Sequence, residues 1–152
     1  MAKLGTGRRR FKEWVKKRSD PKRPLMPLTH IASGVVAEDI INNEQILPKY
    51  CKNFGQDLAY FFYGRPAYRI SADDVVKLEA ACPFCFLFEP HLINDATSIH
   101  AFDTGAFVDR LYRHVIIDEM KVEDYCLDTD STLPNKLISA AFLSPKSYID
   151  GE

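Results

Sequence analysis

The first apolar stripe along the chain predicts a short basic helix over residues 8–18. Phe11, Trp14 and Val15 recur at positions i, i+3 and i+4, which places their side chains on one face of a helix. Proline lacks the backbone N–H that a helix interior needs, so Pro21 is expected to end this segment. The pattern therefore indicates a helix with one apolar stripe among basic side chains.

Two further segments show helical periodicity. Ser33 stands where an N-cap is expected for a helix over residues 34–43, and residues 106–119 carry the strongest helical pattern of the C-terminal half. The apolar positions expected to face the core are Val35, Val36, Ile40 and Ile41 in the first helix and Phe107, Leu111 and Val115 in the second. The polar segment 145–152 is expected to fray.

Residues that favour β-structure predict extended segments between these helices. We expect them at residues 25–31, 58–62, 67–70, 85–88 and 100–102. The segment 85–88 is expected to be buried, and residues 75–78 suit either a helix or a strand. Because helices and strands are mixed along the chain without regular βαβ succession, the order predicts an α+β fold.

The length of 152 residues corresponds to one domain. We expect a basic arm over residues 1–24 and a single α+β domain over residues 25–152. Hydrophobic residues make up 46% of the chain, and no apolar run approaches the roughly 18 residues of a membrane span. The first basic residues are not followed by an apolar core and a cleavage site, so the expected location is cytoplasmic.

Charge is strongly polarised along the chain. Residues 1–23 hold ten Lys or Arg and two acidic residues, net +8, whereas the remainder carries −9. Clustered cations attract phosphates, which indicates a nucleic acid as partner. The candidate contacts are Arg8, Arg9, Arg10, Lys16, Lys17 and Arg18. The alternative is that this segment docks on acidic residues of its own chain or of an acidic protein partner.

Four cysteines without a secretory signal indicate reduced thiols rather than a disulfide framework. Cys82 and Cys85 form a CxxC pair with three open interpretations: a redox site of glutaredoxin type, a zinc site, or core packing. The zinc site would add His91 and either Cys51 or Cys126.

One further motif, Phe102-Asp103-Thr104-Gly105, matches the triplet of aspartic proteases in a single copy. A helix cap explains it more simply, since Asp103 stands directly before the segment 106–119 and Asp is a preferred N-cap residue. We therefore expect a structural role for Asp103.

The residues with the most ligand-binding chemistry lie between 58 and 70. This stretch, LAYFFYGRPAYRI, places aromatic rings and two arginines around a Gly64-Arg65-Pro66 turn. Aromatics offer stacking faces and arginine a fixed fork of donors, which suits a strand that ends at a ligand. His30, in the segment Thr29-His30-Ile31, is most simply a core or interface histidine and could also join such a site.

The order of these motifs resembles the ADP-ribosyltransferase fold, nearest to the DarT-like branch of DNA-modifying toxins. That branch has an early strand with Thr-His-Ile, a helix, an Ile-Leu return and a Tyr-Phe strand that ends in Arg and Pro. The matching features here are Leu28 to Ile31, Val35 to Ile41, Ile46-Leu47-Pro48, and Tyr60 to Pro66. The resemblance covers residues 27–70 and implies small antiparallel sheets that enclose an NAD cleft.

The resemblance also implies roles for individual residues. His30 would hold the ribose on the nicotinamide side. The face on which nicotinamide stacks would come from Tyr60, Tyr63 or Tyr68, and Arg65 would orient an NAD phosphate or the target base.

The chemistry implied is loss of nicotinamide through an oxocarbenium-like cation that a carboxylate stabilises. The family places this catalytic Glu on a late strand. Here the acidic candidates are Glu119, at a predicted helix end, and the terminal Glu152, and neither has such a strand around it. We take Glu119 as the catalytic candidate beside Arg65. An NAD-dependent enzyme and a non-catalytic binding module of the same fold remain alternatives.

Overall fold

The computed structural model describes residues 7–67 and 82–151, without side chains for residues 7–10. The chain forms two compact units, the central unit Met26–Pro90 and the split unit of Met1–Leu25 with His91–Glu152. Helices mix with small antiparallel sheets, so the predicted α+β class is confirmed. One boundary lies beside the expected division at residue 24, but residues 1–25 belong to one unit with residues 91–152, and the expected domain 25–152 is divided between the two units.

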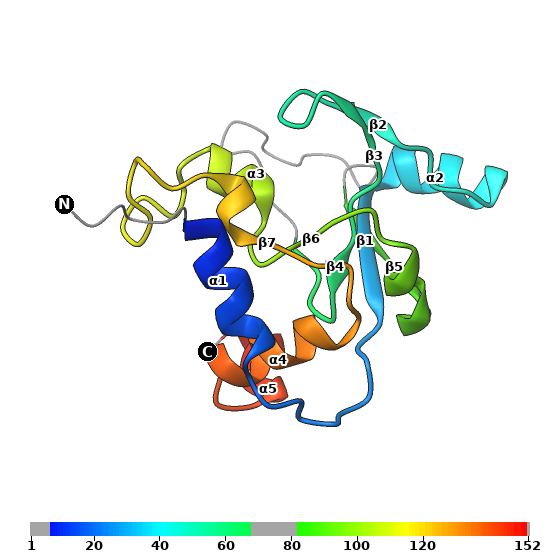
Figure 1. The fold of residues 1–152 in the computed structure, drawn as a ribbon. Coiled ribbons are helices and arrows are strands. Elements are labelled where there is room, and N and C mark those ends of the chain that lie inside the picture. Colours follow the sequence, from blue (N-terminus) through cyan, green and yellow to red (C-terminus); the bar gives the residue numbers. More distant parts are fainter. Residues whose placement is uncertain (1–6, 68–81, 152) are drawn as a thin grey trace. The chain divides into compact units, whose positions relative to one another are not determined.

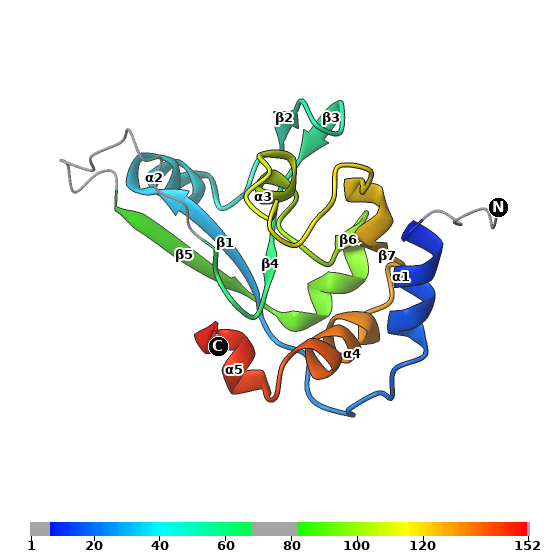
Figure 2. The same ribbon diagram turned by 90° about the vertical axis from the view of Figure 1, so that its left-hand side faces the viewer.

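The central unit is built on a three-stranded antiparallel sheet in the order β4-β1-β5 (Figures 1 and 2). Its strands are β1 (Leu28–Ser33), β4 (Phe62–Tyr63) and β5 (Pro83–Phe88). Strand β1 contains Thr29 and Ile31, β-branched residues that favour extended backbone. Thr29 pairs with Phe62 on one side and with Leu87 on the other. The predicted extended segment 25–31 is thus confirmed in its second half.

Helix α2 (Gly34–Asn43) follows β1 directly, as predicted. Ser33 occupies the N-cap position with extended backbone, and Glu44 ends the helix in the left-handed region at φ 53°. The predicted apolar face is wrong for Val35 and Ile41, which are exposed, whereas Val36 and Ile40 are half-buried and Ala37 is the buried residue. At roughly 100° per residue, Val35 lies about 200° around the helix from Ala37, and α2 leads away from the end of β1 (Figure 1).

The predicted strand 58–62 is also wrong as a single element. Strand β3 (Gln56–Leu58) pairs with β2 (Lys49–Cys51) in a hairpin, whereas Phe62 already belongs to β4 and pairs with β1. The chain changes sheets between Leu58 and Phe62, so residues 59–61 lie outside both ladders. The predicted segments 67–70 and 75–78 lie outside the described residues, apart from Ala67, which is not in a strand.

Strand β5 confirms the predicted strand 85–88 and begins two residues earlier. Its expected burial is wrong, because the Leu87 side chain is 70% exposed and Cys85 is exposed as well. Among the described strands β5 pairs only with β1, so it is an edge strand. An edge position leaves its outer side uncovered by a neighbouring strand.

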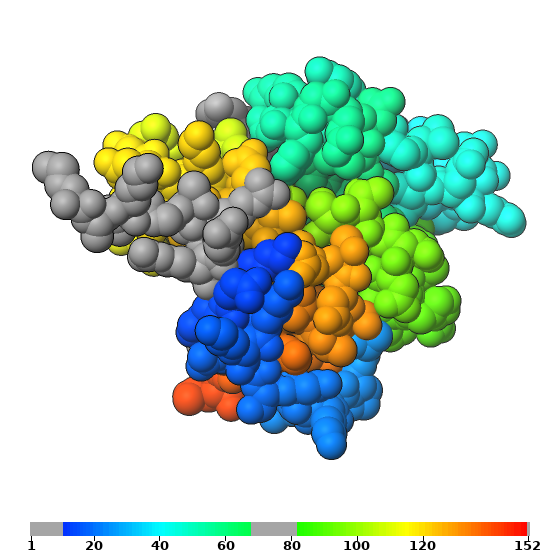
Figure 3. Space-filling model, viewed as in Figure 1, coloured from blue at the N-terminus to red at the C-terminus, as the bar shows by residue number. Residues whose placement is uncertain are grey.

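In the split unit, helix α1 (Gly7–Lys16) confirms the predicted basic helix. Val15 is fully buried and forms a core with Leu127 and Leu133. Phe11, Ile99 and Leu137 pack around this core. The C-terminal residues thus complete the apolar surface of α1, which lies beside α4 (Thr132–Ala141), as Figure 3 also shows.

The remaining elements of the split unit are short. They are η2 (Pro90–Asp95), which begins at the boundary, β6 (Ile99–His100), α3 (Thr104–Val108), η3 (Val122–Tyr125), β7 (Cys126–Leu127) and α5 (Pro145–Asp150). Strands β6 and β7 pair antiparallel. The predicted strand 100–102 is confirmed only at His100, because β6 begins one residue earlier and ends there. None of the described helices is long and apolar enough to cross a membrane.

The predicted helix 106–119 is wrong over most of its length. Asp103 caps α3 by accepting the Ala106 N–H at 3.1 Å, which confirms its structural role. The helix ends at Val108, and Arg110 has the left-handed φ of 56°, a backbone conformation that interrupts a right-handed helix. Leu111 and Val115 are consequently exposed in the turns that follow.

The expectation that the C-terminal segment frays is wrong as well. Helix α5 begins after Ser144, whose side chain accepts the Ser147 N–H at 3.0 Å, and Pro145 occupies the first turn. Gly151 ends the helix at φ 79°. Serine at the N-cap, proline in the first turn and glycine after the last turn are strong boundary signals, and they determine this short element.

Candidate functional site

One face of the central sheet collects aromatic rings around His30. Alternate residues of a strand point to the same side, so Leu28, His30 and Ala32 share one side of β1. Their partners in β5 are Phe88, Phe86 and Phe84. Leu28 also pairs with Tyr63 of β4, and the His30 ring lies 5.6 Å from the Phe61 ring. We call His30, Phe61, Tyr63, Phe84, Phe86 and Phe88 the aromatic face.

The rings of the aromatic face are only partly covered. Phe61 is 39% exposed and Phe84 49% exposed, while Phe86 and Phe88 are half-buried. Phe61 packs edge-on against Phe88 with ring centres 5.4 Å apart, so its orientation is fixed. Flat apolar rings held in place at a surface can stack with a planar ligand group.

His30 is oriented by the segment that lies beside β1. Its Nδ1 lies 2.8 Å from the backbone carbonyl oxygen of Tyr60. A carbonyl oxygen can only accept, so Nδ1 carries the hydrogen and donates it. In the neutral ring Nε2 is then an acceptor. A donor such as a sugar hydroxyl would find a fixed lone pair there.

Thr29 secures the segment that orients His30. It is fully buried, and its hydroxyl donates to the Phe62 carbonyl oxygen at 3.3 Å, next to the β1–β4 ladder. This side-chain bond supplements a ladder of only two residue pairs. Thr29 therefore holds Tyr60, Phe61 and Phe62 near His30.

Tyr63 ends the aromatic segment in a constrained position. Its hydroxyl oxygen accepts the Met26 N–H at 3.0 Å, and burial raises the pKa of the phenol above its usual value. Gly64 follows at φ 74°, and its N–H donates to the Pro27 carbonyl oxygen at 2.8 Å. A Cβ on Gly64 would meet the Met26 side chain, including Met26 Cβ at 3.0 Å. Glycine is therefore required here for both conformation and space.

Arg65 emerges from this turn with an exposed side chain. Its N–H donates to the Tyr63 carbonyl oxygen at 2.8 Å, which places Arg65 beyond the Pro27 end of the ladder. His30 lies three residues further along β1 than Pro27, about 10 Å at the strand rise of ~3.3 Å per residue. A compact ligand would reach one of these side chains, whereas an extended dinucleotide could reach both.

Tyr60 extends the site toward the β2–β3 hairpin. Its hydroxyl donates to Cys51 Sγ at 3.0 Å. This hydrogen bond, helped by the backbone N–H groups of the hairpin turn, lowers the pKa of the Cys51 thiol. Tyr60 therefore has its hydroxyl engaged, and its ring is not among the aromatic face.

The structure thus gathers four of the predicted site residues, His30, Tyr60, Tyr63 and Arg65, in the central unit. Tyr68 lies outside the described residues. The proposed catalytic residue Glu119 belongs to the split unit, where it is exposed in a turn instead of ending a helix. No strand surrounds it, since the described residues 109–121 form turns and irregular backbone.

The sequence reasoning overlooked the phenylalanines of the aromatic face. Tyrosines were expected to supply the stacking surface, but Phe61 is the ring next to His30, and β5 contributes Phe84, Phe86 and Phe88. Their spacing of two was the available signal, because strand residues two apart share a face.

The basic side chains of the first helix and of the residues after it differ in their surroundings. Lys12 and Lys16 both form ion pairs with Asp128, the second at 2.5 Å, so the predicted docking on acidic residues of the same chain holds for these two. Lys17 and Arg18 are exposed. Arg8, Arg9 and Arg10 lie in α1, but their side chains are outside the described residues.

The cysteines do not form the sites considered for them. All four are free thiols. Cys82 and Cys85 are exposed, so the core-packing interpretation is wrong, and Cys85 lies within strand β5, not at the start of a helix as in glutaredoxins. Across residues 7–67 and 82–151 no group of three or more His, Cys, Asp or Glu is placed to bind a metal ion.

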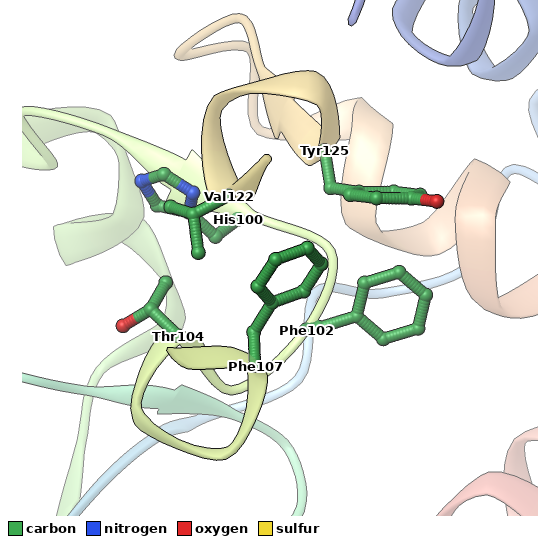
Figure 4. Close-up of a pocket in the computed structure, with 6 residues that line it drawn as sticks. All are labelled: His100, Phe102, Thr104, Phe107, Val122 and Tyr125. Carbon is green, nitrogen blue, oxygen red and sulfur yellow. The ribbon is translucent and has the colours of Figure 1, made fainter. Parts of the chain in front are cut away.

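A hollow in the split unit is lined mainly by aromatic side chains (Figure 4). The lining residues are His100, Phe102, Thr104, Phe107, Val122 and Tyr125. Tyr125 packs edge-on against Phe102 with ring centres 4.9 Å apart, and the space left is too narrow for a water molecule. The side chains of this cluster therefore pack against one another and leave no space for a ligand.

Comparisons with protein families, with curated protein sequences and with solved structures gave no significant match to this chain.

Proposed function

We propose that the central unit binds NAD on its aromatic face and that the protein is an ADP-ribosyltransferase-like protein acting on or recognising nucleic acid. The observation that carries this proposal is the orientation of His30. Its Nδ1 donates to the Tyr60 carbonyl oxygen, which turns Nε2 into a fixed acceptor beside exposed rings. A ribose hydroxyl next to a planar nicotinamide would meet both features.

The spacing of the polar groups supports a dinucleotide over a smaller ligand. Arg65 and His30 lie at different distances along the sheet, on either side of the Leu28–Tyr63 pair. Arg65 can donate two parallel hydrogen bonds to a phosphate, while the aromatic face stacks the ring and His30 holds the sugar. The order of motifs in residues 27–70 supports the same assignment.

Calorimetry with NAD tests this proposal through His30. His30→Asn keeps a donor for the Tyr60 carbonyl and has no atom equivalent to Nε2. We expect the dissociation constant for NAD to rise roughly threefold to tenfold, from the ~0.5–1.5 kcal/mol of one hydrogen bond. The matched control is His114→Asn, since His114 is exposed in a turn of the split unit.

The comparison of the two variants decides the role of His30. NAD binding that is equal in His30→Asn and His114→Asn, with both proteins folded by circular dichroism, would remove His30 from the site. A protein that binds no NAD in any form would overturn the proposed function.

The position of Glu119 favours a second candidate, a non-catalytic binding module of the same fold. A catalytic carboxylate must be held where positive charge develops, and Glu119 is exposed in a turn. Incubation with NAD and mixed nucleic acid, followed by mass spectrometry, separates the two. An enzyme releases nicotinamide and leaves an adduct, and Glu119→Gln abolishes both if Glu119 is catalytic. Binding without turnover indicates the module.

A further inference from the structure

The outer side of strand β5 carries backbone groups that pair with no strand among residues 7–67 and 82–151. The pattern follows from Pro27, whose carbonyl oxygen faces β4 because it accepts the Gly64 N–H at 2.8 Å. Backbone groups of successive residues point to alternate sides of a strand. Leu28, His30 and Ala32 therefore turn their N–H and C=O groups toward β5.

The backbone of β5 alternates in the same way. The β5 partners of these three residues are phenylalanines, and their N–H and C=O groups face β1 in return. Cys85 and Leu87, which lie between the phenylalanines, turn their backbone groups outward, on the side of β5 away from β1 and β4 (Figure 2). Pro83 also faces outward but has no N–H to donate. The outer edge thus offers one N–H and one C=O from each of Cys85 and Leu87.

The side chains along this edge are exposed and uncharged. Leu87 is 70% exposed and Phe84 49%, and Cys85 is exposed as well. Natural proteins protect edge strands with charged residues or prolines, and β5 has neither after Pro83 at its start. Its six residues are enough for a full ladder. These features suit pairing with a strand of another chain.

We propose that β5 pairs with β5 of a second copy of this chain, antiparallel and centred on Phe86. A twofold axis at Phe86 places Cys85 opposite Leu87 of the second copy, and Leu87 opposite its Cys85. These residues have the outward backbone groups, so each pair can exchange two hydrogen bonds. A centre at Cys85 would instead set Leu87 opposite a proline, and a centre at Leu87 would set Cys85 opposite Glu89, which lies beyond β5.

Charge and symmetry favour a second copy as the partner. Strand β5 has no charged side chain, so two identical strands meet without repulsion. In this register Glu89 of each chain lies opposite Pro83 of the other, which places the two carboxylates at opposite ends of the ladder. Leu87 covers Cys85 of the second copy on one side of the joined sheet, and the two Phe86 side chains lie beside each other on the opposite side. The edge is therefore complementary to itself.

Sedimentation velocity of the full chain at concentrations up to about 100 μM, with a thiol reductant present, measures this dimer. Leu87→Lys should raise the dissociation constant of the dimer roughly tenfold to 100-fold, because two leucines lose their burial and two charges enter the ladder. The matched control is Leu47→Lys, since Leu47 is 64% exposed in the same unit and lies outside the strands. We expect its dissociation constant to stay within about twofold of the wild type.

Amide hydrogen exchange measured by NMR tests the register. Raising the protein concentration should slow exchange at the N–H groups of Cys85 and Leu87 more than at that of Phe86, which already faces β1. Monomers at every concentration overturn the proposal and leave the edge to a different protein. A dimer that Leu87→Lys forms as well as the wild type, with both folded by circular dichroism, overturns it too, because the contact then lies elsewhere.

Discussion

The two units of the molecule bury different kinds of side chain. In the split unit, large aliphatic residues are fully enclosed, with Val15 and Leu133 at most 1% exposed. Among the described residues of the central unit, those buried are Leu28, Thr29, Ala32 and Ala37, which are mostly small, while phenylalanines remain partly exposed. Both units also expose apolar side chains, so the difference lies in the buried residues: the split unit has a core of large aliphatic side chains, and the central unit buries mainly small ones.

This difference assigns different tasks to the two regions. Burial of large apolar side chains is the main favourable contribution to folding, so the core around Val15 stabilises the split unit. Partly exposed rings contribute less to stability and offer surface to a ligand or partner. In the central unit, the segment beside β1 is held by the Thr29 hydroxyl, the Met26–Tyr63 hydrogen bond and the Gly64 turn.

The largest effect is expected from truncating the core of the split unit. Leu133→Ala should lower the free energy of unfolding by about 2–5 kcal/mol, because it removes buried methyl groups and leaves a cavity. Leu87→Ala in β5 should change it by about 0.5 kcal/mol or less, since this leucine is exposed. Urea denaturation followed by Trp14 fluorescence and by circular dichroism measures both. Equal losses for the two variants would contradict the contrast between the units.

A smaller effect is expected at the turn after Tyr63. Gly64→Ala should destabilise the β1–β4 pairing by about 1–3 kcal/mol, because alanine is strained at positive φ and its Cβ would meet Met26. Gly55→Ala is the matched control: Gly55 also has positive φ, at 65°, but no atom lies within 4 Å of its added Cβ. Hydrogen exchange of peptides from β1 and β4 measures the difference. If these peptides exchanged faster in Gly55→Ala than in Gly64→Ala, the contact with Met26 would not be what makes glycine necessary at position 64.

The smallest effect concerns the chemistry of the exposed surface. The Tyr60 hydroxyl lowers the pKa of Cys51, so more thiolate is present at neutral pH than in an unassisted thiol. Tyr60→Phe should raise that pKa and slow alkylation of Cys51 at pH 7 roughly twofold to fivefold, since nucleophilicity partly compensates. At pH values well above the ordinary thiol pKa both thiols are ionised, and the variant should then react at least as fast as the wild type, because a thiolate of higher pKa is the better nucleophile.

Peptide mass spectrometry after iodoacetamide treatment measures this rate, with exposed Cys82 of the same protein as the internal reference. If Cys51 reacts equally fast at pH 7 in both proteins, the hydrogen bond from Tyr60 does not activate it. The measured quantity is the reaction rate of one thiol in the central unit. It therefore tests the surface of that unit independently of the stability of the split unit's core.

Local signals in the sequence predicted those elements whose boundaries depend on neighbouring residues. The basic helix, the helix after Ser33 and the cap by Asp103 follow from caps, prolines and periodicity. The helix expected over 106–119 fails because the backbone turns at Arg110, and no proline or glycine marks that position. Periodicity alone could not show that Leu111 and Val115 have no partner surface within reach.

The polar residues of the candidate site were predictable from the sequence, whereas the aromatic rings around them were not. His30 and Arg65 stand out by residue type, and their motifs follow one another within one segment of the chain. Which ring lies beside His30 depends on the register of β1 with β4 and β5, a long-range property. The predicted burial of Val35 and Ile41 in α2 and of strand β5 was wrong for the same reason, since exposure depends on which strands and helices become neighbours.

The discontinuity of the split unit has a consequence for the order of synthesis. Helix α1 is made first, but its core partners Leu127 and Leu133 follow more than 110 residues later, roughly 5–20 s at typical rates of translation. The strands β1, β4 and β5 are complete by Phe88, well before that. We therefore expect the nascent chain to assemble the central sheet first, while the apolar stripe of α1 waits for the C-terminal residues.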